Sequence, residues 1–196
     1  MSFGYIGDTS TSVKQQVKNK GILTTQESFD LERQGFLGGS LELIHSISIS
    51  SATATADFIN IKEDKYNIHL LTMTAEGGAD YDILLSNDNG SNFISSGYAY
   101  ALQYGTSAGS FGADNNTSDS KIMFTQGSSN ENGYAYFYHL GNSAKYSFIN
   151  NQAYGVNGFK YGGGVYPVAQ VNNAIRVDGR SGDFTKAELN LFGIKQ

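Results

Sequence analysis

The chain has 196 residues, a formal net charge of −5 and a pI near 5.1, so it is too short for two ordinary domains and lacks a nucleic-acid binder's basic stripe. It contains no cysteine, which excludes a disulfide scaffold, a thiolate metal site and a cysteine nucleophile. Its first residues lack the regions of a signal peptide, and no apolar run approaches the ~20 residues of a membrane span. We therefore expect a soluble protein made in a cytoplasm, with no membrane insertion.

Residues 1–40 differ in pattern from the rest of the chain. Asp8 and Thr24 precede two short segments with helical spacing, which Gly21 and Gly35 would end. Neither segment is long enough to hold as an isolated helix. We expect a docking arm, extended or partly helical, that becomes ordered against a partner; a frayed terminus is the alternative. The arm side chains expected to make assembly contacts are Phe3, Tyr5, Ile6, Phe29 and Phe36.

From residue 41 on, apolar residues alternate with polar ones, which predicts about eight strands with one apolar face each. The alternating residues are Leu41 and Leu43, Ile47 and Ile49, Tyr66 to Leu70, Tyr81 to Leu85, Tyr98 to Tyr104, Ile122 and Phe124, Tyr134 to Leu140, Tyr146 and Phe148, Ile175 and Val177, and Leu189 and Leu191. No helical period longer than two turns appears here, which argues against a parallel α/β sheet. Residues 41–196 are therefore predicted to form one all-β domain, a jelly-roll-like antiparallel β-sandwich.

Between the predicted strands, composition indicates turns and loops. The Asp-Asn-Gly sequence at residues 88–90 predicts a turn with positive φ angles, and Pro167 is expected between strands. Two segments rich in Gly, Ser and Asn, 105–119 and 150–164, are predicted to be long exposed loops. The second carries three aromatic residues that are candidates for stacking on a ligand, Tyr154, Phe159 and Tyr161.

Candidate catalytic patterns are few. Gly-Thr-Ser-Ala-Gly at residues 105–109 matches the G-x-S-x-G nucleophile pattern, which requires a strand-to-helix turn that exposes Ser107. The sequence that follows cannot open a stable helix, so no catalytic residue is assigned. The three histidines, His45, His69 and His139, share no local metal-binding spacing. His69 is expected on the solvent side of its strand, opposite its apolar neighbours.

The carboxylates give no clear metal pattern. Asp80 and Asp82 fall on one face of a strand, whereas Asp88, Asp114 and Asp119 fall in predicted loops. Oxygen-rich loops can bind calcium, but none of these segments has the spacing of a calcium loop, and turn chemistry accounts for the same residues. We therefore predict neither a metal nor another cofactor.

The aromatic residues are the most informative class, with 13 Tyr, 12 Phe and no Trp. Two tyrosine ladders have a period of two: Tyr134, Tyr136 and Tyr138 form one, and Tyr98, Tyr100 and Tyr104 form the other. One interpretation is cross-strand packing in the core. The other is an exposed tyrosine surface for contact with protein or sugar, because tyrosine combines a flat apolar ring with a polar tip.

Four segments, GGSLELI at 38–44, IKEDKYNIHL at 61–70, LLSNDNGSNF at 84–93 and KAELNLFGI at 186–194, resemble strands of small jelly-roll proteins of tailed bacteriophages, particularly marine and cyanobacterial ones. The resemblance covers roughly residues 38–196 and contains no catalytic motif. It implies a structural role in the virion, as a tail- or fibre-associated module or as capsid decoration. The implied partners are other virion proteins and copies of the chain itself.

Three functions follow as hypotheses. The first is a non-enzymatic virion structural protein that forms a symmetric homo-oligomer, with the arm buried in a neighbour. The second is a carbohydrate-binding module for host-surface glycans, which would use the two predicted loops. The third is a hydrolase, such as a depolymerase or esterase, which would depend on Ser107.

Overall fold

The computed structural model describes residues 41–77, 80–125, 130–180 and 182–194, and these form twelve strands and no helix. The strands are β1 (Leu41–Ile49), β2 (Thr55–Ile59), β3 (Ile68–Gly77), β4 (Tyr81–Ser86), β5 (Tyr98–Thr106), β6 (Phe111–Asp119), β7 (Ile122–Met123), β8 (Asn130–Tyr138), β9 (Ser147–Gly155), β10 (Gly158–Tyr166), β11 (Ala174–Gly179) and β12 (Phe184–Ile194). The predicted arm lies outside the described residues. Since the described residues form no helix, they contain none that could cross a membrane.

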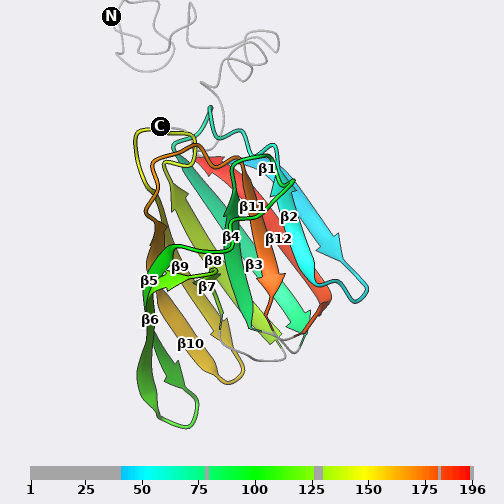
Figure 1. The fold of residues 1–196 in the computed structure, drawn as a ribbon. Coiled ribbons are helices and arrows are strands. Elements are labelled where there is room, and N and C mark those ends of the chain that lie inside the picture. The colour runs from blue at the N-terminus through cyan, green and yellow to red at the C-terminus, as the bar shows by residue number, and fades with distance from the viewer. Residues whose placement is uncertain (1–40, 78–79, 126–129, 181, 195–196) are drawn as a thin grey trace, which may run out of the picture. The chain divides into compact units, whose positions relative to one another are not determined.

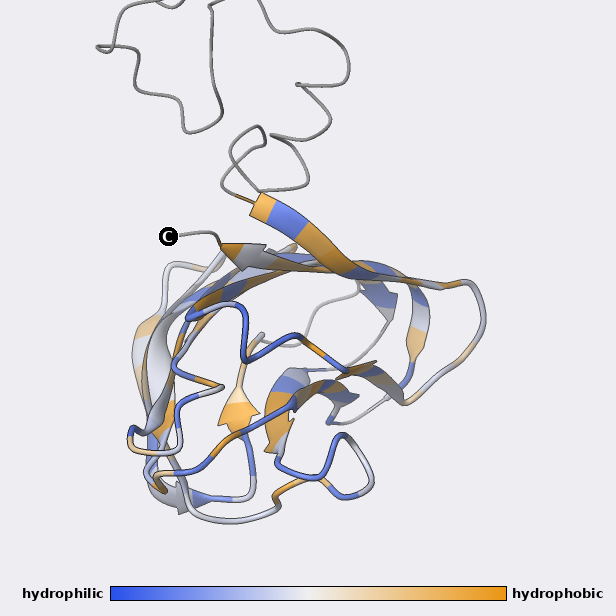
Figure 2. Ribbon diagram, turned by 90° about the horizontal axis from the view of Figure 1, so that it is seen from above, coloured by the Kyte–Doolittle hydropathy of each residue, from blue (hydrophilic) through white to orange (hydrophobic). Residues whose placement is uncertain are grey.

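Two sheets pack face to face. The larger has eight strands in the order β1-β12-β3-β8-β9-β10-β5-β6, and the smaller has four in the order β2-β11-β4-β7. Figure 1 shows the two layers, and Figure 2 shows the larger sheet curving around the smaller one. The assigned strand registers are antiparallel. The prediction of an antiparallel β-sandwich is confirmed.

Four strand pairs, β1–β12, β2–β11, β3–β8 and β4–β7, alternate between the two sheets. Without β5, β6, β9 and β10, the chain would be one long hairpin whose successive strand pairs fall in different sheets. The remaining strands form two hairpins, β5–β6 and β9–β10, each inserted into that path. Both add to the same edge of the larger sheet, beyond β8, and so double its width.

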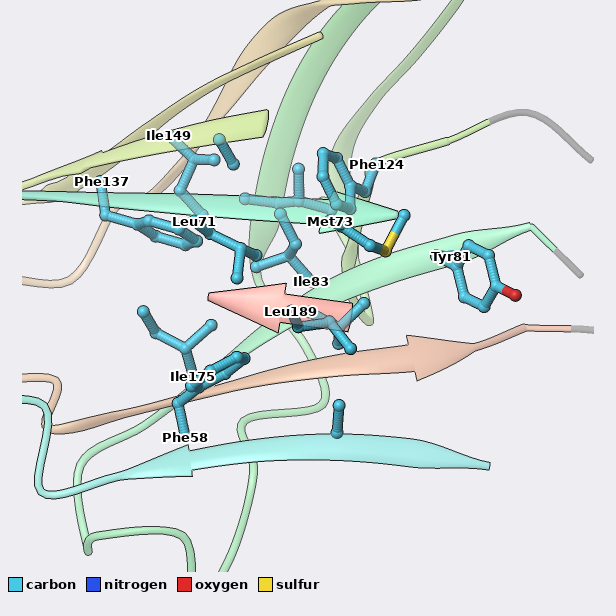
Figure 3. Packing of buried hydrophobic residues seen from close by; sticks show 14 of the residues in the cluster. Phe58, Leu71, Met73, Tyr81, Ile83, Phe124, Phe137, Ile149, Ile175 and Leu189 are labelled. Atoms are coloured by element: carbon cyan, nitrogen blue, oxygen red, sulfur yellow. The ribbon is translucent and has the colours of Figure 1, made fainter. Parts of the chain in front are cut away.

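The core lies between the sheets, where every second residue of each strand points inward. Leu71 and Met73 on β3, Phe137 on β8 and Leu189 on β12 form one cluster with Ile83 on β4 from the other sheet (Figure 3). Tyr81 and Phe184 stack with ring centroids 4.3 Å apart at one end of this core. The core positions predicted at Tyr81–Leu85, Ile175 and Val177, and Leu189 and Leu191 are confirmed.

Two predicted loops are strands instead. Segment 105–119 contains the end of β5, a tight turn and the whole of β6, and segment 150–164 contains most of the β9–β10 hairpin. The composition was misleading because β6 is an edge strand whose residues from Asp114 to Asp119 are all polar, and because β10 carries a run of glycines. Those glycines allow close approach of neighbouring strands: a Cβ on Gly163 would lie 2.5 Å from the Ile149 carbonyl oxygen.

The predicted turn at residues 88–90 is confirmed. Asn89 and Gly90 have φ angles of 57° and 86°, and the Asp88 carboxylate accepts a hydrogen bond from the Asn92 backbone N–H at 2.8 Å. That bond is the largest cause of the lowered pKa of Asp88. Pro167 follows β10 and precedes β11, as predicted.

His69 is buried in the core, so the prediction of a solvent-facing side chain is wrong. The core-facing residues of β3 are His69, Leu71, Met73 and Ala75, whereas Ile68 and Leu70 face the other way. The His69 Nε2 lies 2.9 Å from the Ile61 carbonyl oxygen, which can only accept, so Nε2 carries the proton. Period-two spacing located the strand but could not tell which of its two apolar faces is inside.

We expect His69 to make stability depend on pH. Burial lowers its pKa from 6.5, so the unfolded chain binds a proton more readily than the folded one. Stability from this residue is therefore unchanged above pH 6.5 and falls below it, with a slope approaching about 1.4 kcal/mol per pH unit. Urea unfolding at pH 7.5 and 5.5 should show that the free energy of unfolding falls less between these two pH values in His69→Gln than in the unchanged protein. An equal fall in both proteins would contradict this role of His69, and His45→Gln is the control.

Candidate functional site

The larger sheet has one face that packs on the smaller sheet and one, here called the outer face, that does not. The strand registers place its outer side chains in straight rows across the sheet. One such row, starting on β12 and crossing β3, β8, β9, β10 and β5, consists of Asn190, Thr72, Tyr134, Gln152, Tyr161 and Gln103. Side chains from neighbouring strands are therefore aligned with one another on the outer face.

The tyrosine ladders lie on opposite faces of this sheet. Tyr134, Tyr136 and Tyr138 point outward, which supports the surface interpretation for that ladder. Tyr98 and Tyr100 are buried against the smaller sheet, which supports the core interpretation for the other. The Tyr100 hydroxyl donates a hydrogen bond to Asp119 at 3.1 Å, and burial raises the pKa of Tyr100 to about 12.

An apolar patch covers the outer face of β12, β3 and β8. We define the apolar patch as Ile68, Leu70, Tyr136, Tyr138 and Phe192. Leu70 lies directly opposite Phe192 on one side and Tyr136 on the other, while Ile68 lies opposite Tyr138. Each of these side chains is partly buried. Solvent-facing strand positions are usually polar, so this contiguous patch is a candidate contact surface.

Next to the patch, tyrosines and amides are hydrogen-bonded across the strands. The Tyr134 hydroxyl donates to the Gln152 side-chain oxygen at 2.5 Å, and the Gln152 amide donates to the Tyr154 hydroxyl. The Tyr161 hydroxyl donates to the Gln103 side-chain oxygen, which links β10 to β5. These contacts hold the rings in fixed orientations while leaving them at the surface.

A shallow trough runs along β5, between β10 and β6. Its floor consists of small residues, Ala99, Ala101 and Gly163, and one hollow of about 590 Å³ lies over them between Phe148 and Asn115. A second hollow, of about 420 Å³, follows along β5 and is lined by Gln103, Tyr104, Phe111, Gly112, Ala113, Phe159 and Tyr161. The Tyr161–Gln103 pair lies between the two hollows. We refer to the two hollows together as the trough.

The aromatic walls of the trough are strongly exposed. Phe111 is 79% exposed, Phe148 47% and Tyr161 43%. Phe159 contacts rings on both sides: its centroid is 6.0 Å from that of Tyr161 and 6.4 Å from that of Phe111. Exposed rings beside amide side chains are suited to contacts that combine an apolar surface with hydrogen bonds.

The outer positions of β8, β9, β10, β5 and β6 carry no charged side chain. Charges lie beneath the trough, on the inner side of the sheet. Lys160, only 3% exposed, pairs with Asp114 at 2.9 Å and lies 5.9 Å from the centre of the Tyr104 ring. This ion pair joins β10 to β6.

A second ionic cluster connects the smaller sheet to the inserted β5–β6 hairpin. Asp82 on β4 has no exposed surface and accepts two hydrogen bonds from Arg180, one of them at 2.7 Å. Lys121, which follows β6, lies 3.1 Å from Asp82 and 2.9 Å from Asp178. Asp80 also pairs with Arg180, at 3.7 Å, so Asp80 and Asp82 share a face as predicted. Ion pairing gives these carboxylates a structural role.

No group of His, Asp or Glu side chains within residues 41–77, 80–125, 130–180 and 182–194 is arranged to hold a metal ion. Ser107 lies in the β5–β6 hairpin turn, where its backbone N–H donates to the Asn157 carbonyl at 2.9 Å. A hairpin turn is not the strand-to-helix turn that the nucleophile pattern requires. The G-x-S-x-G match is therefore accounted for by a glycine-containing turn.

Tyr154, Phe159 and Tyr161 are on strands, not on a loop as predicted, but the structure does bring them together on the outer face. The aromatic character of the three residues and the two-residue spacing of Phe159 and Tyr161 were the available signals. Gln103, Gln152 and the floor of the trough were not predicted, because small and amide residues do not contribute to an apolar alternation pattern. Phe3, Tyr5, Ile6, Phe29 and Phe36 lie outside the described residues.

Comparisons with known proteins identify no family. No family model matches the chain, and neither does any curated protein. Among solved structures, one of the alginate lyase Aly36B in complex with an alginate trisaccharide aligns with 76% of this chain and 81% of that chain, at 11% identity and a TM-score of 0.22. A likeness of this size assigns neither a fold nor an activity to the chain.

Proposed function

We infer that the β-sandwich is a jelly roll. The strand pairs β1–β12, β2–β11, β3–β8 and β4–β7 alternate between sheets, as they do when one long hairpin is rolled into two layers. On this interpretation β5–β6 and β9–β10 are insertions that widen one sheet. These two insertions supply all the lining residues of the trough.

We propose that the chain is a non-enzymatic structural protein of a bacteriophage virion, made in the host cytoplasm and acting through assembly contacts. The apolar patch is the observation that carries this proposal. It places Ile68, Leu70 and Phe192 on the face of the sheet that no part of the sandwich core covers. Burying such a surface against another protein releases water, at roughly 25 cal/mol per Å² of apolar area.

The partners are copies of the chain and other virion proteins, in a tail, a fibre or a capsid decoration. A closed homo-oligomer buries the apolar patch of each subunit with a finite number of subunits. Residues 1–40 are assigned to a docking arm and residues 41–196 to the sandwich. The viral source is supported by the resemblance of the strand sequences, and the contact role by the chemistry of the patch.

Cysteine labelling tests where the contact lies, because the chain has no cysteine of its own. A single cysteine introduced by Leu70→Cys should react slowly with maleimide in the assembled protein and faster on dilution to subunits. The control is Thr74→Cys, on the same strand and face but outside the patch, and it should react at one rate in both states. Equal behaviour of the two variants would contradict assembly through the patch.

Recognition of host-surface glycans is a second function, and the trough is the observation that favours it. Its rings and amides offer an apolar surface and hydrogen-bonding groups side by side. It lies on β9, β10, β5 and β6, away from the patch on β12, β3 and β8. Both surfaces can therefore be used in one assembled protein.

A further inference from the structure

The trough has the shape of a site for an extended ligand. Its two hollows follow one another along β5, from Ala99 to Gln103 and Tyr104, and both are open to solvent. The floor is flat because Gly163 has no side chain, and its site has no space for one, and because Ala99 and Ala101 carry only a methyl group. A compact ligand would fill one hollow, whereas an extended chain would occupy both and cross the Tyr161–Gln103 pair between them.

The walls combine two kinds of contact. Phe148, Phe159 and Tyr161 offer ring surfaces on which the C–H faces of sugar rings can stack. Asn115 and Gln103 offer amide groups that can both donate to and accept from hydroxyls. A purely apolar ligand would leave the Asn115 amide and the Gln103 side-chain N–H groups without hydrogen-bond partners, and such unsatisfied groups oppose binding.

Charge narrows the ligand class further. Outer positions around the trough are uncharged, and Lys160 beneath it is buried and already paired with Asp114. No cation among the trough's lining residues would neutralise a carboxylate or sulfate group. A charged polymer would therefore lose hydration without gaining an ion pair.

From this geometry we propose that the trough binds a segment of an uncharged, extended oligosaccharide, with Tyr161 and Phe159 as stacking residues and Gln103 and Asn115 as hydrogen-bonding residues. The inference rests on the glycan-binding function and is independent of assembly through the apolar patch. It names the ligand class and the surface that receives it.

The test is calorimetric titration of the full-length protein with cellohexaose, laminarihexaose and mannohexaose, and with hexamannuronate as the charged comparator. At least one neutral hexasaccharide should bind with a Kd below about 1 mM. Tyr161→Ala should weaken that binding about tenfold, through loss of a stacking surface. Ala101→Phe should weaken it as much by filling the trough, and it adds its ring at an exposed position, so the fold is preserved.

Tyr146→Ala is the matched control, an exposed tyrosine outside the trough lining, and it should leave the affinity unchanged. Tighter binding of hexamannuronate, or neutral binding that neither trough variant changes, would overturn the trough proposal while leaving a glycan-binding function in place. Failure of every probe to bind would overturn both. Loss of assembly in Ala101→Phe without any sugar binding would assign the trough to a protein contact and also overturn the proposal.

Discussion

Arg180→Ala is expected to lower the free energy of unfolding by about 3 kcal/mol, because it leaves a buried carboxylate without its main partner. Asp82 has no exposed surface, and after the substitution only Lys121, 3.1 Å away, would face its charge. The Lys121–Asp82 pair, which joins β4 to the segment between β6 and β7, stays in place, so the loss reports on the contact between Arg180 and Asp82. Urea unfolding measures the effect.

Arg176→Ala is the matched control for this prediction. Arg176 lies on β11 and makes the same kind of two-bond pair, with Asp57 at 2.6 Å, but both side chains are partly exposed. Solvent screening limits such a pair to about 1 kcal/mol or less, although the Phe93 ring, 4.0 Å from the guanidinium, adds to it. Similar losses in the free energy of unfolding of the two variants would show that burial of Asp82 does not determine the size of the loss.

Deletion of residues 1–36 is expected to leave a folded sandwich that no longer assembles. Residues 42–196 form a compact unit of their own, and the described core side chains all lie between Ile49 and Leu191. The deletion removes none of these described side chains, so we expect the free energy of unfolding to change by no more than about 0.5 kcal/mol. Circular dichroism would check that the sandwich is folded, and sedimentation would check that it no longer assembles. An unfolded product would contradict the assignment of residues 1–40 to an arm.

Much of the architecture could be predicted from the sequence because antiparallel strands have a strong period. The core positions of β4, β11 and β12 followed directly from alternation at Ile83, Val177 and Leu189. The strand β3 in the larger sheet was harder, because apolar residues lie on both of its faces. On β3, the pairs Ile68/Leu70 and Leu71/Met73 give the same signal, and only tertiary packing decides which pair lies inside.

The candidate site could be predicted only in part. Tyr154, Phe159 and Tyr161 were identified by their aromatic character, although the glycines around them suggested a loop. The floor at Ala101 and Gly163 and the amide of Gln103 could not be identified, because their role depends on cross-strand register. Register is set by pairing between distant segments, here β10 with β5 and β9, which no local pattern encodes.

Light scattering on the intact protein, beside the double variant Leu70→Asn and Phe192→Asn, tests assembly through the apolar patch most directly. One chain has a mass of 21.1 kDa. We predict a small integer multiple of that mass for the intact protein and the single-chain mass for the variant, because the amide side chains would have to be buried without partners. An intact protein that remains a single chain at every concentration, or a variant that assembles as before, would contradict the account.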